Sequence, residues 1–154
     1  MKTLFPALRV SDLDVSLVFY RSFGYEVVGQ LEVDDETRLA MLALPGEREV
    51  SLELVHRASA GPVRADGLDH LAVQVDDLDA TRAQLAAAGL DPGELATPGG
   101  PQGPRTVEVI DPDGFRLELV QWPPGHPVDM TRDDLPDERP TTEPRDDDDE
   151  GALR

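Results

Sequence analysis

Segments from the first half of this chain recur in the second half at one fixed spacing, and this repeat constrains the fold more than any other feature. The recurring pairs are Val10-Ser11-Asp12-Leu13-Asp14 with Val75-Asp76-Asp77-Leu78-Asp79, Gly24 with Gly89, and Leu52-Glu53-Leu54-Val55 with Leu117-Glu118-Leu119-Val120. The members of every pair are 65 residues apart. Duplicated units keep such a spacing where packing demands it. We therefore predict two copies of one module, residues 1–58 and 66–122, joined through a Gly61-Pro62 linker.

Local signals predict the same order of elements in both modules. Each module begins with a strand, at 3–10 or 68–75, and continues with a helix capped by Ser11 or Asp76 and ended by Gly24 or Gly89. Leu13, Leu17 and Tyr20 form the apolar face of the first helix, as Leu78 and Leu85 do in the second. The remaining strands are expected at 25–33, 37–44 and 49–56, and at 90–96, 105–111 and 114–121. The prediction is an α+β fold of two tandem βαβββ modules, which form a curved, cup-like mixed sheet with the helices outside.

Charge is unevenly distributed along the chain. The 14 basic and 32 acidic residues give a formal net charge of -18. From Trp122 to Arg154 there are 11 acidic residues, four arginines and six prolines without apolar periodicity. We therefore expect one folded domain at 1–122 and a disordered, acidic, proline-rich tail at 123–154. Negative charge disfavours nucleic acid and membrane surfaces as partners. The chain has no long apolar run and no signal-like N-terminus, so the sequence predicts a cytoplasmic protein.

Three segments of the predicted domain carry a known pattern. They are Leu8-Arg9-Val10-Ser11-Asp12-Leu13-Asp14 leading into Phe19-Tyr20, Asp69-His70-Leu71-Ala72-Val73, and Asp111-Pro112-Asp113-Gly114-Phe115-Arg116-Leu117-Glu118. Together with the repeat, they resemble the glyoxalase and bleomycin-resistance superfamily, also called the vicinal oxygen chelate superfamily. The resemblance covers residues 1–122 and implies a small-molecule substrate or ligand and a homodimer, in which cups often form across chains.

The resemblance also implies a divalent metal held by up to four side chains, one from the first and one from the last strand of each module. These positions map to Phe5, Glu53, His70 and Glu118. Phe5 has no lone pair to donate, so Glu53, His70 and Glu118 remain as the metal-ligand candidates. The chain has no cysteine, so a metal must be held by His, Asp or Glu. One imidazole and two carboxylates suit Ni, Co, Mn, Fe(II), Zn or Mg in an open site better than a closed structural zinc tetrahedron.

Strand geometry supports a shared site independently of the resemblance. Side chains two residues apart point to the same face of a strand, so Phe5 and Arg9 share one face. His70, Glu53 and Glu118 lie in three comparable rows. Four such rows lining one cup would give an apolar cavity with a few polar groups, as small-molecule sites require.

The sequence leaves several functions open. The first is a metal-dependent lyase or isomerase resembling lactoylglutathione lyase, which acts on a small α-oxo carbonyl compound or its thiol adduct. Glu118 would then be the base, and Arg9 would bind a substrate carboxylate or phosphate. The second is a metal-free, bleomycin-resistance-like binding protein in which Phe5 stacks on the ligand. An extradiol dioxygenase, the third, needs a second histidine in the site.

Each candidate residue also has a purely structural interpretation. Glu53 and Glu118 can be solvent-facing glutamates, because charged residues are usually exposed. His70 can be a hydrogen-bonded structural residue, and Arg9 can belong to an ion pair. For Trp122, packing where the domain ends is the expected role.

Overall fold

The structure is a computed structural model that describes residues 2–126, so residues 127–154 of the predicted tail lie outside the described residues. The first module contains β1 (Ala7–Val10), α1 (Leu13–Ser22), β2 (Glu26–Glu32), β3 (Thr37–Ala43) and β4 (Leu52–Arg57). The second contains β5 (Leu71–Gln74), α2 (Leu78–Ala87), a 3-10 helix η1 (Gly100–Gln102), β6 (Arg105–Ile110) and β7 (Arg116–Gln121).

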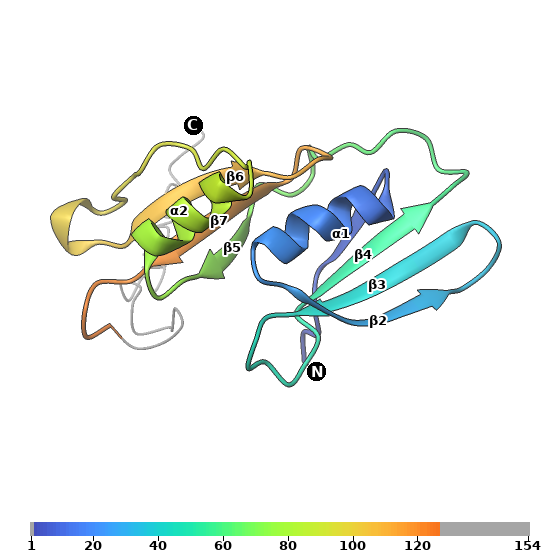
Figure 1. Ribbon diagram of the computed structural model, residues 1–154, viewed down its shortest axis with the longest axis horizontal. Coiled ribbons are helices and arrows are strands. Elements are labelled where there is room, and N and C mark those ends of the chain that lie inside the picture. The colour runs from blue at the N-terminus through green and yellow to red at the C-terminus, as the bar shows by residue number, and fades with distance from the viewer. Residues whose placement is uncertain (1, 127–154) are drawn as a thin grey trace, which may run out of the picture.

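Each module forms its own mixed sheet, and the two modules lie side by side (Figure 1). The strand order is β1-β4-β3-β2 in the first sheet and β5-β7-β6 in the second. In both sheets the first strand runs parallel to the last, and the other neighbours are antiparallel. Helix α1 packs against β4, and α2 packs against β6 and β7. The predicted α+β class with helices on the outside is confirmed.

The parallel strand pairs of the two modules have one register. Ala7 lies opposite Glu53 in the first sheet, and Ala72 lies opposite Glu118 in the second. These pairs are related by the 65-residue shift of the sequence repeat. A single-residue slip would turn every side chain of a strand to the other face, so this shared register gives Glu53 and Glu118 equivalent places in their sheets.

Both helices begin one residue later than the sequence predicts. Asp12, not Ser11, caps α1, and its side chain accepts hydrogen bonds from the backbone N–H groups of Asp14 and Val15. Asp77, not Asp76, caps α2. The backbone N–H of Ser11 instead donates to Asp113 in the second module at 2.9 Å. Among the described residues, no helix is long and apolar enough to cross a bilayer.

The strand expected at 90–96 does not form as a regular element. Gly93 donates a backbone hydrogen bond to Glu108, and Ala96 pairs with Thr106 in an isolated bridge. Gly93 and Ala96 are three residues apart, and both direct their N–H groups to β6, so this segment does not keep the two-residue alternation of a strand. The second module is therefore βαββ with an irregular segment along the edge of β6.

Strands at the start of each module are also shorter than predicted. Pairing begins at Ala7 instead of residue 3, and at Leu71 instead of residue 68. Phe5 and His70 therefore lie just before their strands.

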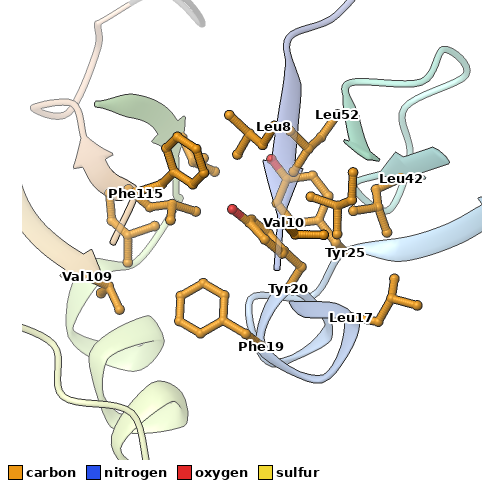
Figure 2. Close-up of a cluster of buried hydrophobic side chains, with 14 of the residues drawn as sticks. Leu8, Val10, Leu17, Phe19, Tyr20, Tyr25, Leu42, Leu52, Val109 and Phe115 are labelled. Atoms are coloured by element: carbon orange, nitrogen blue, oxygen red, sulfur yellow. The ribbon is translucent and has the colours of Figure 1, made fainter. Parts of the chain in front are cut away.

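One hydrophobic core joins the two modules. Figure 2 shows Val109 and Phe115 of the second module facing Leu8, Phe19 and Tyr20 of the first. The buried Tyr20 hydroxyl donates to Asp111 across the modules at 3.0 Å. Burial raises the pKa of both groups above their ordinary values. The contact fixes the position of one sheet relative to the other.

Candidate functional site

Strand alternation separates a core face from an open face in each sheet. Leu117 and Leu119 of β7 are fully buried in the core. Glu118 and Val120, the intervening positions, point to the face away from α2. This open face of the second sheet carries a cavity of about 500 Å³, lined by His70, Ala72, Gln74, Pro98, Pro104, Thr106, Glu118, Val120 and Trp122. Its volume is in the range of small-molecule sites.

His70 and Glu118 meet at this cavity. The Nε2 atom of His70 lies 3.4 Å from Oε2 of Glu118, with 39% and 23% of the two side chains exposed. The parallel pairing of β5 with β7 brings them together, because it sets Ala72 opposite Glu118 and leaves His70 at the start of the same face. An imidazole and a carboxylate in this arrangement can exchange a proton or share a cation.

Asp69 and Arg116 fix the orientation of the His70 ring. Oδ2 of Asp69 lies 2.8 Å from Nδ1 of His70, and Arg116 contacts Oδ1 of Asp69 at 2.7 Å and its backbone oxygen at 2.9 Å. The hydrogen bond with His70, followed by the charge of Arg116, lowers the pKa of the Asp69 carboxyl. The contact on the Nδ1 side orients the ring so that Nε2 points toward Glu118 and the cavity. Sequence reasoning missed Asp69, whose only signal is its place directly before His70.

The other predicted site residues lie elsewhere in the chain. Glu53 sits on β4 of the first sheet and does not line the cavity of about 500 Å³. Phe5 is partly buried just before β1. Arg9 lines a separate cavity of about 180 Å³ with His56, where its guanidinium donates to the backbone oxygen of Pro62.

No three His, Asp or Glu side chains of a single chain cluster closely enough to hold a metal within residues 2–126. The structure therefore brings His70 and Glu118 together and leaves Glu53, Phe5 and Arg9 away from them.

Trp122 has a different place from the packing role expected of it. It lines the cavity directly after β7, and its ring stacks on His126 with centroids 4.2 Å apart and planes 8° from parallel. Strand alternation is a sequence signal for this position, since Glu118, Val120 and Trp122 are successive residues of one face.

Comparisons with known proteins agree with this architecture. Residues 4–119 match the family model described as the Glyoxalase/Bleomycin resistance protein/Dioxygenase superfamily. The chain is 32% identical over 128 residues to a lactoylglutathione lyase of Haemophilus influenzae, and the match covers 79% of this chain and 93% of the relative. A probable lactoylglutathione lyase of Vibrio cholerae is 31% identical, with 81% and 94% covered. The trypanothione-dependent glyoxalase I of Leishmania major superimposes with a TM-score of 0.65 at 26% identity, with 79% and 86% covered.

Proposed function

The chain belongs to the Glyoxalase/Bleomycin resistance protein/Dioxygenase superfamily, and from this premise we propose that it is a metal-dependent lyase or isomerase for the thiol adduct of a small α-oxo aldehyde. The observation that carries the proposal is the pairing of His70 with Glu118 at the 500 Å³ cavity. Two relatives named lactoylglutathione lyase or probable lactoylglutathione lyase support the same reaction class.

The residues at the cavity fit a divalent cation in part. His70 offers an imidazole nitrogen whose ring is already oriented by Asp69, and Glu118 offers a carboxylate 3.4 Å away. Catalytic metal centres commonly use three protein ligands and keep a position open for water or substrate. One chain supplies two donors here, so the proposed centre needs one more.

Glu53 of a second copy is the proposed third donor. It holds the same register position in the first sheet that Glu118 holds in the second. In Figure 1 both helices lie on the same side of their sheets, so the two open faces of one chain look in the same direction. Glu53 does not line the cavity that contains His70 and Glu118 of its own chain. A two-fold dimer would set the open face of one chain's first sheet against the second sheet of the other chain, and would repeat the contact reciprocally.

The proposed reaction is an internal proton transfer. Glu118 removes the proton from the substrate carbon that bears the hydroxyl and sulfur, and returns it to the neighbouring carbonyl carbon. The hydroxyl proton moves to the other oxygen, so the product is a 2-hydroxy thioester with no atom gained or lost. A metal ion held by His70 and the glutamates would polarise the two adjacent substrate oxygens. Asp69 keeps the His70 ring in place throughout.

Arg9 would bind a carboxylate of the thiol part of the substrate. It lies on the open side of β1, and its cavity also contains Arg57, so the local charge is positive. Two guanidinium groups suit planar anions, which they bind through paired hydrogen bonds.

Metal content tests the proposal. Protein purified without chelators should contain about one divalent ion per chain, and His70→Ala should lose it, because removing one of three ligands leaves too few donors. His56→Ala is the matched control and should keep its metal, since His56 lines the other cavity. Turnover of the glutathione hemithioacetal of methylglyoxal should follow metal content. Wild-type protein that stays metal-free and inactive after incubation with Ni, Co, Mn or Zn would overturn the proposal.

A metal-free binding protein is the second candidate, because Phe5 stands where a fourth ligand would be and much of the cavity is apolar. In that case the same titrations would show no metal binding, while an apolar organic ligand would bind unchanged in the presence of a chelator.

A further inference from the structure

The part of the cavity beyond His70 and Glu118 has an apolar wall that the proposed proton transfer does not use. We define this apolar wall as Pro98, Pro104, Val120 and Trp122, all of which line the 500 Å³ cavity. Glu118, Val120 and Trp122 follow one another on one face of the chain, so the Cα atoms of Glu118 and Trp122 are about 13 Å apart. The wall therefore extends well past the reacting end of the cavity. A methyl group next to the reacting carbon could contact little of it.

The rim that carries the two prolines is a tight turn that depends on glycine. Gly99 and Gly100 adopt φ angles of 79° and 80°, and the backbone N–H of Gly103 donates to the oxygen of Gly100 at 3.0 Å. A Cβ atom on Gly103 would lie 2.0 Å from the backbone oxygen of Pro98, so only glycine fits there. This turn places Pro98 and Pro104 at the cavity.

Trp122 is held in place by a stacked neighbour. The near-parallel imidazole of His126 lies 4.2 Å from it between ring centroids. A ring fixed in this way offers a flat apolar surface with little loss of rotamer freedom. Stacked aromatic rings attract each other beyond what the buried area alone gives, so a planar ligand group gains more from this surface than an alkyl group does.

We propose that the apolar wall binds an aromatic substituent next to the reacting carbonyl, so that the substrates are aryl-substituted rather than methyl-substituted α-oxo aldehydes, presented as thiol adducts. The assignment of the reacting group rests on the proposed function, whereas the binding preference does not. The wall supplies the contact area, and the His70–Glu118 pair supplies the polar end.

Binding of two small acids tests the apolar wall without any turnover of substrate. Mandelate and lactate carry the same vicinal oxygens and differ in a phenyl and a methyl group. Trp122 is the chain's one tryptophan, so its fluorescence reports ligands at the wall directly. We expect mandelate to bind the full-length protein about tenfold more tightly than lactate. By calorimetry, Trp122→Ala should lose most of this preference, and Trp122→Phe should keep most of it. Equal affinities for the two acids in the wild type would overturn the proposal, as would a preference unchanged in Trp122→Ala.

Turnover separates a failure of the wall from a failure of the proposed function. The ratio of kcat/KM for the glutathione hemithioacetals of phenylglyoxal and methylglyoxal should favour the phenyl substrate and fall about tenfold in Trp122→Ala. If neither adduct is turned over but mandelate still binds more tightly than lactate, the wall stands and the isomerase proposal falls. In the other case, both adducts are turned over, and the phenyl and methyl adducts have equal kcat/KM values in the wild type and again in Trp122→Ala. The wall proposal is then wrong, and the isomerase proposal stands.

Discussion

Asp69 determines how His70 can act. Its carboxylate contacts Nδ1 of the ring at 2.8 Å and is held in turn by Arg116. Without this partner, the ring would lack the contact that directs Nε2 toward Glu118 and the cavity. Mutating a group that hydrogen-bonds to a metal-binding histidine commonly lowers metal affinity about 10–100-fold. The charged neighbours therefore orient the histidine of the site, although they do not line the cavity.

Phe5 is the residue whose chemistry conflicts with the proposed metal centre. Phe5→His should tighten Ni, Co or Mn binding in calorimetric titrations, because an imidazole at the position equivalent to His70 would replace a bound water in a site already organised by other ligands. Leu4→His is the matched control, since it adds an imidazole at an exposed neighbouring position. Equal metal affinities for the wild type and both variants would show that position 5 does not face the metal.

Asp111 gives the fold a specific pH dependence. Burial raises the pKa of its carboxyl, although hydrogen bonds from Phe115, Tyr20 and Asp113 act in the opposite direction. A raised folded pKa means that the stability from this group is fully present below the ordinary value, about 3.9, and is lost as the pH rises through the folded pKa.

The variant Asp111→Asn removes this titration, because an asparagine side chain cannot ionise. As the pH rises from acid to neutral, the free energy of unfolding of the wild type should therefore fall relative to that of Asp111→Asn. Urea denaturation at a series of pH values measures the difference, and Asp91→Asn controls for the change in net charge. A difference that grows in favour of the wild type toward neutral pH would contradict the raised pKa.

At the scale of elements, the start of α1 coincides with a contact between modules that local sequence does not reveal. Ser11 and Asp12 are both good capping residues, and the choice depends on where β1 ends and on the use of the Ser11 N–H by Asp113. Apolar periodicity, in contrast, identified the buried faces of both helices correctly, because Leu13, Leu17 and Leu78 have to reach the core wherever the cap lies.

The caps can be ranked by experiment. Asp12→Ala should lower the free energy of unfolding by about 1 kcal/mol, because two backbone N–H groups lose their acceptor. Ser11→Ala should change it by less than about 0.5 kcal/mol, since the Ser11 contact to Asp113 comes from the backbone. Chemical denaturation of both variants decides the matter. A greater loss in Ser11→Ala than in Asp12→Ala would mean that the cap is at residue 11.

The 65-residue repeat predicted the equivalence of Glu53 and Glu118 but not the irregular edge of the second module. Pro92 was a sequence signal against a regular strand at 90–96, because it lacks an N–H group. Alternation along strands predicted that His70 and Glu118 share a face. It could not place Glu53 relative to them, because the orientation of one sheet toward another depends on the inter-module core and on assembly, not on local periodicity.

At the scale of the whole molecule, the shared core explains why one chain presents two separate open faces. Tyr20 and Asp111 join the modules on the helix side, and Phe115 packs there as well. Glu53 lies on one open face and Glu118 on the other, where Glu118 contacts His70 of the same chain. The proposed shared site needs a dimer that brings these two faces together, so light scattering should show a dimer at micromolar concentration.

A mixed dimer tests most directly the claim that His70 and Glu118 of one copy act together with Glu53 of another. Glu53→Ala and His70→Ala should each be inactive alone. When they are co-expressed, every hybrid dimer contains one intact site, because the intact Glu53 of one chain meets the intact His70 of the other. Random pairing should restore about a quarter of wild-type turnover and metal content. A mixture as inactive and metal-free as its two parents, beside an active wild type, would contradict the account.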